Sequence, residues 1–180
     1  MKVVNHTILG YLLLLGSIVY IAGCSQGNEP PSDAFWQAVK EGTVQDVKRF
    51  IEKERVNVNA QDKDGMTALH HVIVFNPDVD IAKYLIEKGA DVNAKSHEGW
   101  TPFHVIAPYI ATGTDSRYGL AILLLENGAD VNAKNSEGKT PLDLITEVGA
   151  LFTKAGLDFF RKAAEQGNPK AKEILQQLEK

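Results

Sequence analysis

The chain has 180 residues, of which 44% are hydrophobic, 8% aromatic and 23% charged, a balance typical of a globular protein. Its 19 basic and 23 acidic residues give a net charge of −4, and no segment gathers Lys or Arg into the positive stripe that binds nucleic acid. We therefore expect no nucleic-acid partner. The single cysteine excludes both an intramolecular disulfide and a cysteine-rich zinc site.

The N-terminal segment has the pattern of a secretory signal. Met1–Lys2 forms a short basic start, and Ile8–Ile21 is an apolar run of 14 residues. A membrane-spanning helix needs roughly 20 such residues, so the run is closer in length to a signal-peptide core. The run ends in Ile21-Ala22-Gly23-Cys24, which contains the only cysteine of the chain. An uncleaved membrane anchor, a buried core helix and a signal with an ordinary cleavage site remain alternatives.

These residues resemble the lipobox of bacterial lipoprotein signal peptides, which are cleaved before a cysteine that then carries lipid. The resemblance implies a signal peptide over 1–23 and lipid attachment at Cys24, so we expect the membrane contact to be made through the N-terminal lipid. Ser25 follows the cysteine where an aspartate would favour the inner membrane. The same resemblance thus favours the outer membrane, on its periplasmic side. The polar stretch 24–32, with two adjacent prolines, predicts a tether.

A repeated sequence dominates the remainder of the chain. Gly-Ala-Asp-Val-Asn-Ala-Lys occurs at 89–95 and again at 128–134, and a partial copy occupies 56–61. A glycine turn and a helix start follow these copies, at Gly65, Gly99 and Gly138. Successive turns are 34 and 39 residues apart, a period that indicates stacked structural units.

The repeats resemble ankyrin repeats, whose unit has about 33 residues. That resemblance implies an all-α solenoid of about four helix-pair units with a C-terminal capping helix. We expect units over 33–60, 61–94, 95–133 and 134–167, and the capping helix over 168–180. A shorter similarity, over 159–168, is to tetratricopeptide-related short α/α solenoids, which also form helix pairs.

Several residues predict local structure within the units. Thr43 and Asp46 have the spacing of a capping box at a helix start. Gly89 and Gly128 stand where a helix must end in a left-handed residue. The run 120–125 is apolar nearly all round, so we expect a central helix that is buried from both sides.

One segment satisfies a permissive nucleotide-binding pattern. Ala133–Thr140 matches a P-loop in which alanine replaces the first glycine. A working P-loop follows a buried strand and cradles phosphate with backbone N–H groups, whereas this segment follows a polar turn. The other repeats have Met66 and Trp100 at the position of Lys139. A nucleotide-binding enzyme that uses Gly138-Lys139-Thr140 is the alternative function, but we expect no catalysis.

The histidines predict structure rather than chemistry. His70 and His104 match the histidine of the ankyrin Thr-Pro-Leu-His motif, which in that family bonds neighbouring backbone. His71 and His97 lack the fixed spacing of metal ligands, and we expect them on a solvated face. We therefore expect no catalytic residue, no cofactor and no metal.

Partner binding is expected at the turns and at the ends of the first helices, as the family resemblance implies. The partner-binding candidates are Met66, His97, Glu98, Trp100, Tyr109 and Lys139. We expect Trp100 to be exposed, whereas for Tyr109 exposure and burial remain equally open. The acidic turn residues Asp64, Glu98 and Glu137 favour a basic partner.

The sequence as a whole predicts a monomeric, lipid-anchored periplasmic protein that binds a protein partner of unknown identity. A scaffold role and an immunity or inhibitor role both fit, and a purely structural envelope lipoprotein is a further alternative. Extra residues around 110–117 make either a mobile loop near the binding face or a tolerated surface insertion.

Overall fold

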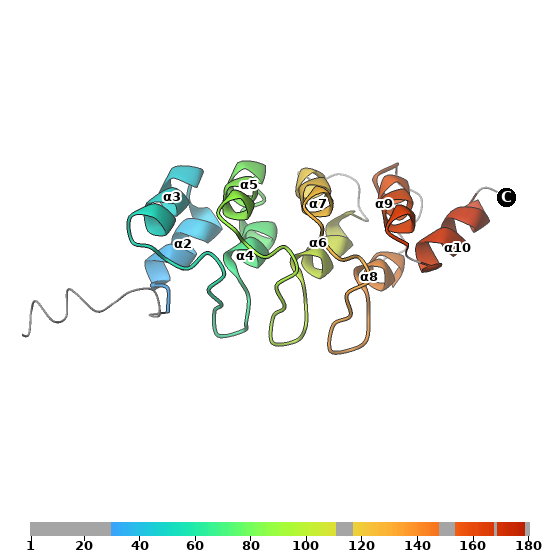
Figure 1. The fold of residues 1–180 in the computed structure, drawn as a ribbon, viewed down its shortest axis with the longest axis horizontal. Helices are drawn as coiled ribbons and strands as arrows, with labels where there is room; N and C mark the ends of the chain where they lie inside the picture. Colours follow the sequence, from blue (N-terminus) through green and yellow to red (C-terminus); the bar gives the residue numbers. More distant parts are fainter. Residues whose placement is uncertain (1–29, 111–116, 148–153, 168, 179–180) are drawn as a thin grey trace, which may run out of the picture.

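A computed structural model describes residues 30–110, 117–147, 154–167 and 169–178 (Figure 1). Within these ranges the secondary structure is helical, apart from an isolated antiparallel bridge between Gln61 and Thr67. The predicted signal peptide, Cys24 and residues 111–116 of the predicted insertion lie outside the described residues.

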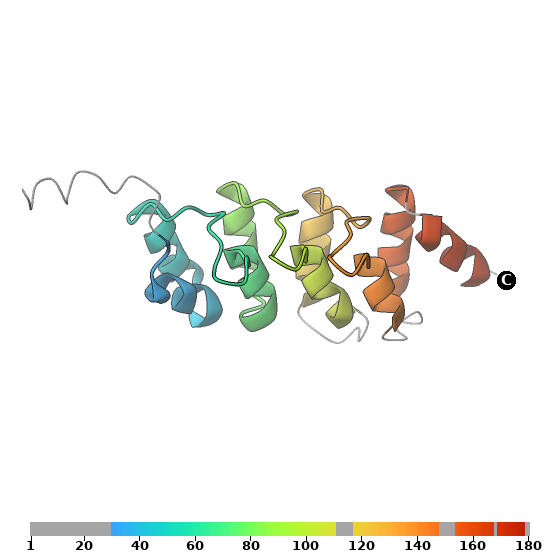
Figure 2. The same cartoon turned by 90° about the horizontal axis from the view of Figure 1, so that it is seen from below.

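The helices form pairs that follow one another along the long axis of the molecule (Figures 1 and 2). They are α2 (Asp33–Glu41), α3 (Val44–Glu52), α4 (Ala68–Phe75), α5 (Val79–Glu87), α6 (Pro102–Ile110), α7 (Arg117–Glu126), α8 (Pro141–Glu147), α9 (Lys154–Glu165) and α10 (Pro169–Leu178). One layer contains α2, α4, α6 and α8, each packed on the next, and α3, α5 and α7 form the other layer with α9. The all-α solenoid that the repeats imply is confirmed.

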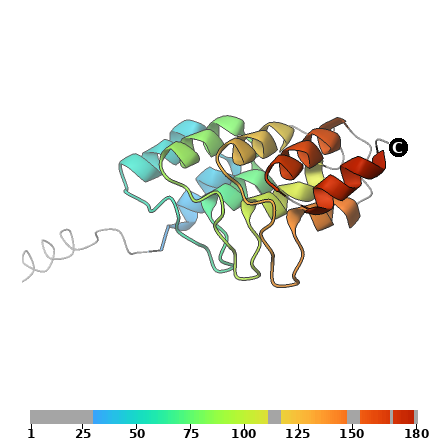
Figure 3. The same ribbon diagram turned by 45° about the vertical axis from the view of Figure 1, so that its right-hand side comes forward.

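Long loops connect the pairs and project side by side beyond the layer of α2, α4, α6 and α8 (Figure 3). Asparagine side chains join each loop to the next. Asn59 donates from Nδ2 to the Gly89 carbonyl (2.9 Å), and its Oδ1 accepts from the backbone N–H of Asp91 (2.8 Å). Asn93 repeats the first contact with the Gly128 carbonyl at 3.0 Å. These bonds fix the spacing of successive loops.

A hydrophobic core runs between the two layers, and its burial is the main stabilising contribution to the fold. Its largest fully buried side chains are Phe35, Phe103, Leu69, Ile73, Ile81, Leu85, Ile106, Ile110, Leu120, Leu124 and Leu142. The predicted capping box is present: the Asp46 carboxylate accepts from the backbone N–H of Thr43 at 2.9 Å, while the Thr43 hydroxyl accepts from that of Asp46. Gly89 and Gly128 follow α5 and α7 with φ of 89° and 85°, the left-handed ends expected there.

The expectation that the helix over 120–125 is buried from both sides needs correction. Leu120, Leu124 and Leu125 are buried, but Ile122 and Leu123 are only half-buried. The reason is the position of α7 in the outer layer, where it packs on α5 and α6 and leaves its opposite face to solvent.

Candidate partner-binding site

Equivalent loop residues lie in a row because the loop tips are hydrogen-bonded to one another. We call these turns tip 1 (62–66), tip 2 (96–100) and tip 3 (135–139). The backbone N–H of His97 donates to the Asp64 carbonyl at 3.0 Å, and that of Ser136 donates to the Glu98 carbonyl at 2.9 Å. Gly65, with φ 76°, makes the first approach possible, since a Cβ there would lie 2.5 Å from the His97 nitrogen.

Buried histidines tie each helix start to the next tip. His70 Nδ1 accepts from the backbone N–H of Thr67 at 3.1 Å, so its proton resides on Nε2, which donates to the Trp100 carbonyl at 3.0 Å. His104 makes the equivalent contact with the Lys139 carbonyl at 3.1 Å. Burial lowers the pKa of His70 to about 4 and also lowers that of His104, so both rings stay neutral near pH 7. The predicted structural role of these histidines is confirmed.

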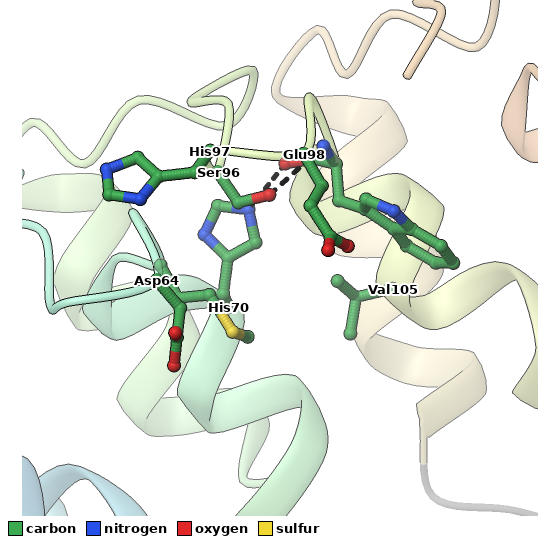
Figure 4. A pocket seen from close by; sticks show the side chains of 8 residues that line it. Asp64, His70, Ser96, His97, Glu98 and Val105 are labelled. Carbon is green, nitrogen blue, oxygen red and sulfur yellow. Dashed lines mark hydrogen bonds between the residues drawn. The ribbon is translucent and has the colours of Figure 1, made fainter. Parts of the chain in front are cut away.

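Between tips 1 and 2 the surface forms a groove of about 370 Å³, open to solvent (Figure 4). It is lined by Asp64, Met66, His70, Ser96, His97, Glu98, Trp100 and Val105. The Glu98 side chain extends toward Val105, whereas the His97 ring points away from them. Four of the predicted partner-binding residues thus meet at one groove, although they come from two repeats.

Those four residues differ in exposure. His97 and Glu98 are exposed, and Met66 is half-buried. The expectation that Trp100 is exposed needs correction, because Trp100 is half-buried and packs against the core, with its ring centroid 6.0 Å from that of His104. One part of the indole is therefore covered by the core, and the remainder lines the groove.

The other two predicted binding residues lie outside this groove. Tyr109, near the end of α6, is half-buried, and the Arg117 guanidinium lies 4.2 Å from its ring centroid. Arg117 Nε also donates to the Ile73 carbonyl at 2.9 Å, which fixes the guanidinium over the ring. Lys139, on tip 3, forms an ion pair with Glu137 at 3.3 Å.

The backbone donors of the P-loop-like segment are already used within the protein. The N–H groups of Glu137 and Lys139 both donate to Asn135 Oδ1 at 3.0 Å. The remaining donors of this turn, and their acceptors, are Asn135 N to Lys139 O, Ser136 N to Glu98 O, Gly138 N to Asn135 O and Thr140 N to Asp143 Oδ2. A phosphate would have to compete for each of these bonds, which argues against nucleotide binding here.

His71 corrects a further expectation, because it is buried rather than on a solvated face. Its Nε2 lies 2.7 Å from Asp62 Oδ2, and the rings of Trp36 and Phe75 flank it at 5.2 and 5.7 Å. Burial lowers the pKa of His71 despite the carboxylate. Burial alone would raise the pKa of Asp62, but bonds donated by the following backbone and by His71 lower it. No local motif predicts this pair, because the burial of His71 depends on α2 and α6, which pack on either side of α4.

The residues that the structure describes contain no group of three or more His, Cys, Asp or Glu side chains arranged to hold a metal ion. No helix in the same ranges is long and apolar enough to cross a membrane. The groove between tips 1 and 2 brings together four of the six sequence-predicted binding residues.

Comparisons with known proteins agree with this architecture. A family model described as ankyrin repeats (3 copies) matches residues 35–135. A segment of 52 residues is 40% identical to the palmitoyltransferase akr1 of Schizosaccharomyces pombe, covering 29% of this chain but only 8% of that enzyme. Such a short match transfers no enzymatic activity, and ankyrin repeats suggest a protein–protein interaction module. The chain belongs to the ankyrin-repeat family.

Proposed function

We propose that this protein is a non-catalytic interaction module, lipid-anchored in the bacterial envelope, that binds a protein partner through its concave face and loop tips. The observation that carries the binding proposal is the groove between tips 1 and 2, where Met66, His97, Glu98 and Trp100 converge. Solenoids commonly bind partners on such repeated surfaces. A scaffold role and an immunity or inhibitor role use the same surface, and the identity of the partner distinguishes them.

The groove is held in shape before any partner arrives. Its two sides are joined by the bond from His97 N–H to the Asp64 carbonyl and by the bond from His70 to the Trp100 carbonyl. A surface that is already ordered loses little conformational entropy on binding, so more of the contact energy contributes to affinity. Trp100 also belongs to a residue type that often contributes most of the binding energy at protein interfaces.

The sequence before α2 supports anchoring through lipid. The apolar run before Cys24 and the lipobox-like residues imply lipidation, and 24–32 form a tether of nine residues. Helix α2 starts directly after Ser32, whose hydroxyl accepts from the backbone N–H of Phe35. A fully extended tether of that length reaches at most about 30 Å, so the module would act close to the membrane surface.

Site-specific photocrosslinking in intact envelopes tests the binding proposal. A photoreactive amino acid replaces His97, an exposed lining residue whose ring points away from Glu98, so the other residues that line the groove are unchanged. The matched control carries the same group at Lys83, exposed on α5 in the other helix layer. We expect a discrete crosslinked protein from position 97 and none from position 83. Equal crosslinking from both positions, or none from either, would instead support the structural-lipoprotein alternative.

Lipid attachment needs a separate test. Cys24→Ala is expected to abolish lipidation and to leave an uncleaved precursor, which detergent phase partitioning and intact-mass measurement detect. A Cys24→Ala protein that still carries lipid would remove the anchoring part of the proposal and leave the binding part standing.

A further inference from the structure

We propose that the groove between tips 1 and 2 binds an arginine side chain that projects from an extended segment of the partner protein. This inference rests on the proposed function, because it assigns an occupant to the same groove. It adds the chemical class of the partner residue and the position on the solenoid at which that residue binds.

The first argument is charge. Asp64 and Glu98 both line the groove with exposed side chains, and no ion pair is formed by either carboxylate within the described ranges. The equivalent acidic residue of tip 3, Glu137, is already neutralised by Lys139 at 3.3 Å. The groove therefore offers two carboxylates to an incoming cation, whereas tip 3 supplies its own cation.

The second argument is the nature of the walls. Trp100 contributes a partly exposed indole, and Met66 and Val105 are half-buried apolar side chains that also line the groove. A long basic side chain can lay its methylene groups along such walls while its charge remains near the carboxylates. The face of an indole attracts cations, and tryptophan is the strongest of the aromatic residues in this respect.

The third argument favours arginine over lysine. A guanidinium is planar, stacks on an aromatic ring and presents several donors in a fixed fork, whereas an ammonium is a compact and strongly hydrated point charge. Within this groove a ring and two carboxylates are provided together, which suits the planar group. Arginine is also enriched at protein interfaces, while lysine is depleted.

The neighbouring repeats confine the proposed arginine site to one position along the solenoid. At the position of Trp100, tip 3 carries Lys139, a cation that would repel a second one. On the other side, the surface near α2 includes Lys40 and Lys63. An extended partner segment would thus place its arginine between tips 1 and 2, and the repeats on either side would not favour a positive charge.

The test uses the full-length protein in detergent micelles and two capped pentapeptides, Gly-Ala-Arg-Ala-Gly and Gly-Ala-Gln-Ala-Gly. The chain has two tryptophans, so NMR of the indole N–H groups reports the groove through Trp100 and a remote position through Trp36. We expect the arginine peptide to shift the Trp100 resonance in a saturable manner. The glutamine peptide should not, and Trp36 should remain unshifted.

Matched variants assign the effect to the groove. Glu98→Gln removes one groove carboxylate, and Glu137→Gln removes the equivalent carboxylate of tip 3; both side chains are exposed, so neither change should disturb the fold. We expect Glu98→Gln to weaken arginine-peptide binding by about threefold to fivefold and Glu137→Gln to leave it unchanged. Trp100→Leu, which keeps an apolar side chain, should weaken binding by about tenfold.

The proposal is overturned if the glutamine peptide shifts Trp100 as strongly as the arginine peptide, or if Glu98→Gln and Glu137→Gln have equal effects. Failure of this inference remains distinguishable from failure of the proposed function. A partner that crosslinks from position 97 with no response to the arginine peptide would leave the binding function standing and remove the arginine. Peptide binding without any crosslinked partner would show that the groove accepts an arginine side chain, but it would remove the protein partner from which that arginine is inferred to come.

Discussion

The second and fourth repeats differ at the third residue of their first helix, which is His70 in one and Asp143 in the other. The comparison separates two roles of this position, the capping of its own helix and the contact with the next repeat. His70 accepts from the backbone N–H of Thr67 and also reaches the Trp100 carbonyl of the following repeat. Asp143 accepts from the backbone N–H of Thr140 at 2.8 Å and from its hydroxyl at 2.7 Å. Both residues cap their own helix, and the histidine also couples its repeat to the next one.

The contact that couples the second repeat to the third lies at the groove between tips 1 and 2. His70 bonds to the backbone of Trp100, a residue that lines the groove, so the same contact stabilises the stack and orients the binding surface. A partner-binding tip must keep its geometry in the absence of the partner if binding is to be efficient. The His70 contact therefore serves both the stack and the groove, while the equivalent His104 contact joins α6 to tip 3 outside the groove.

Acid should weaken the coupled repeats most, and this is the largest effect that we expect. Burial lowers the pKa of His70 from 6.5 to about 4 and also lowers those of His71 and His104. Below pH 6.5 the unfolded chain binds protons that the folded chain excludes, so the free energy of unfolding should fall until pH 4. His70 alone corresponds to a loss of about 3 kcal/mol.

Urea unfolding at pH 7.5, 6.0, 5.0 and 4.0 measures this loss. His70→Asn serves as the comparison, because asparagine cannot bind the proton and its unfolding free energy should depend less on pH. Equal pH dependence in the two proteins would show that His70 is not the residue that excludes the proton.

Removing the coupling alone should have the next largest effect. In His70→Asn, the shorter amide can still accept from the backbone N–H of Thr67 but cannot reach the Trp100 carbonyl, which is left without this donor. We expect the free energy of unfolding at pH 7.5 to fall by about 2 kcal/mol. Asp143→Asn, which keeps a capping oxygen, should cost less than about 1 kcal/mol. If the two variants lose the same stability, the contrast between coupling and capping is wrong.

Two glycines with the same backbone angle sharpen the comparison between the tips. Gly65 and Gly138 both have φ 76°, but a Cβ on Gly65 would lie 2.5 Å from the His97 nitrogen, whereas a Cβ on Gly138 meets no atom within 4 Å. Gly138→Ala should therefore cost only the strain of the left-handed backbone, about 1 kcal/mol. Gly65→Ala should cost about 1 kcal/mol more, because tips 1 and 2 must separate.

Thermal unfolding of both variants, together with the response of Trp100 to the arginine peptide, checks this prediction. We expect only Gly65→Ala to reduce the peptide response. Equal losses of stability would mean that the contact between tips 1 and 2 contributes little.

Much of this architecture could be predicted from the sequence because each ankyrin repeat contains the same short motifs, which specify its helix starts and turns. The Thr43–Asp46 capping box and the left-handed Gly89 and Gly128 each follow from residues within a few positions of one another. Periodicity then orders the units without any knowledge of distant contacts. Their equivalent places in successive repeats also predict Met66 and Trp100 as binding residues, and the structure adds that both line one groove.

The errors arose where the environment of a side chain depends on other repeats. His71 was expected in solvent, but α2 and α6 cover the two sides of α4, and Asp62 supplies a partner nine residues away. A turn position predicts an exposed Trp100, yet its side chain packs against the core. The burial of a side chain in one repeat depends on the repeats packed against it, and a local sequence pattern does not specify those contacts.

Lys139→Ala is expected to have the smallest effect and addresses the alternative nucleotide-binding function. Its ion pair with Glu137 is partly exposed, so the free energy of unfolding should change by less than about 0.5 kcal/mol. ATP binding, measured by calorimetry, should be undetectable for the wild type and for the variant, because the N–H groups of this turn are bonded within the protein. ATP affinity in the wild type that disappears in Lys139→Ala would mean that tip 3 rearranges to release those donors, and the rigid row of tips inferred from tips 1 and 2 would not extend to tip 3.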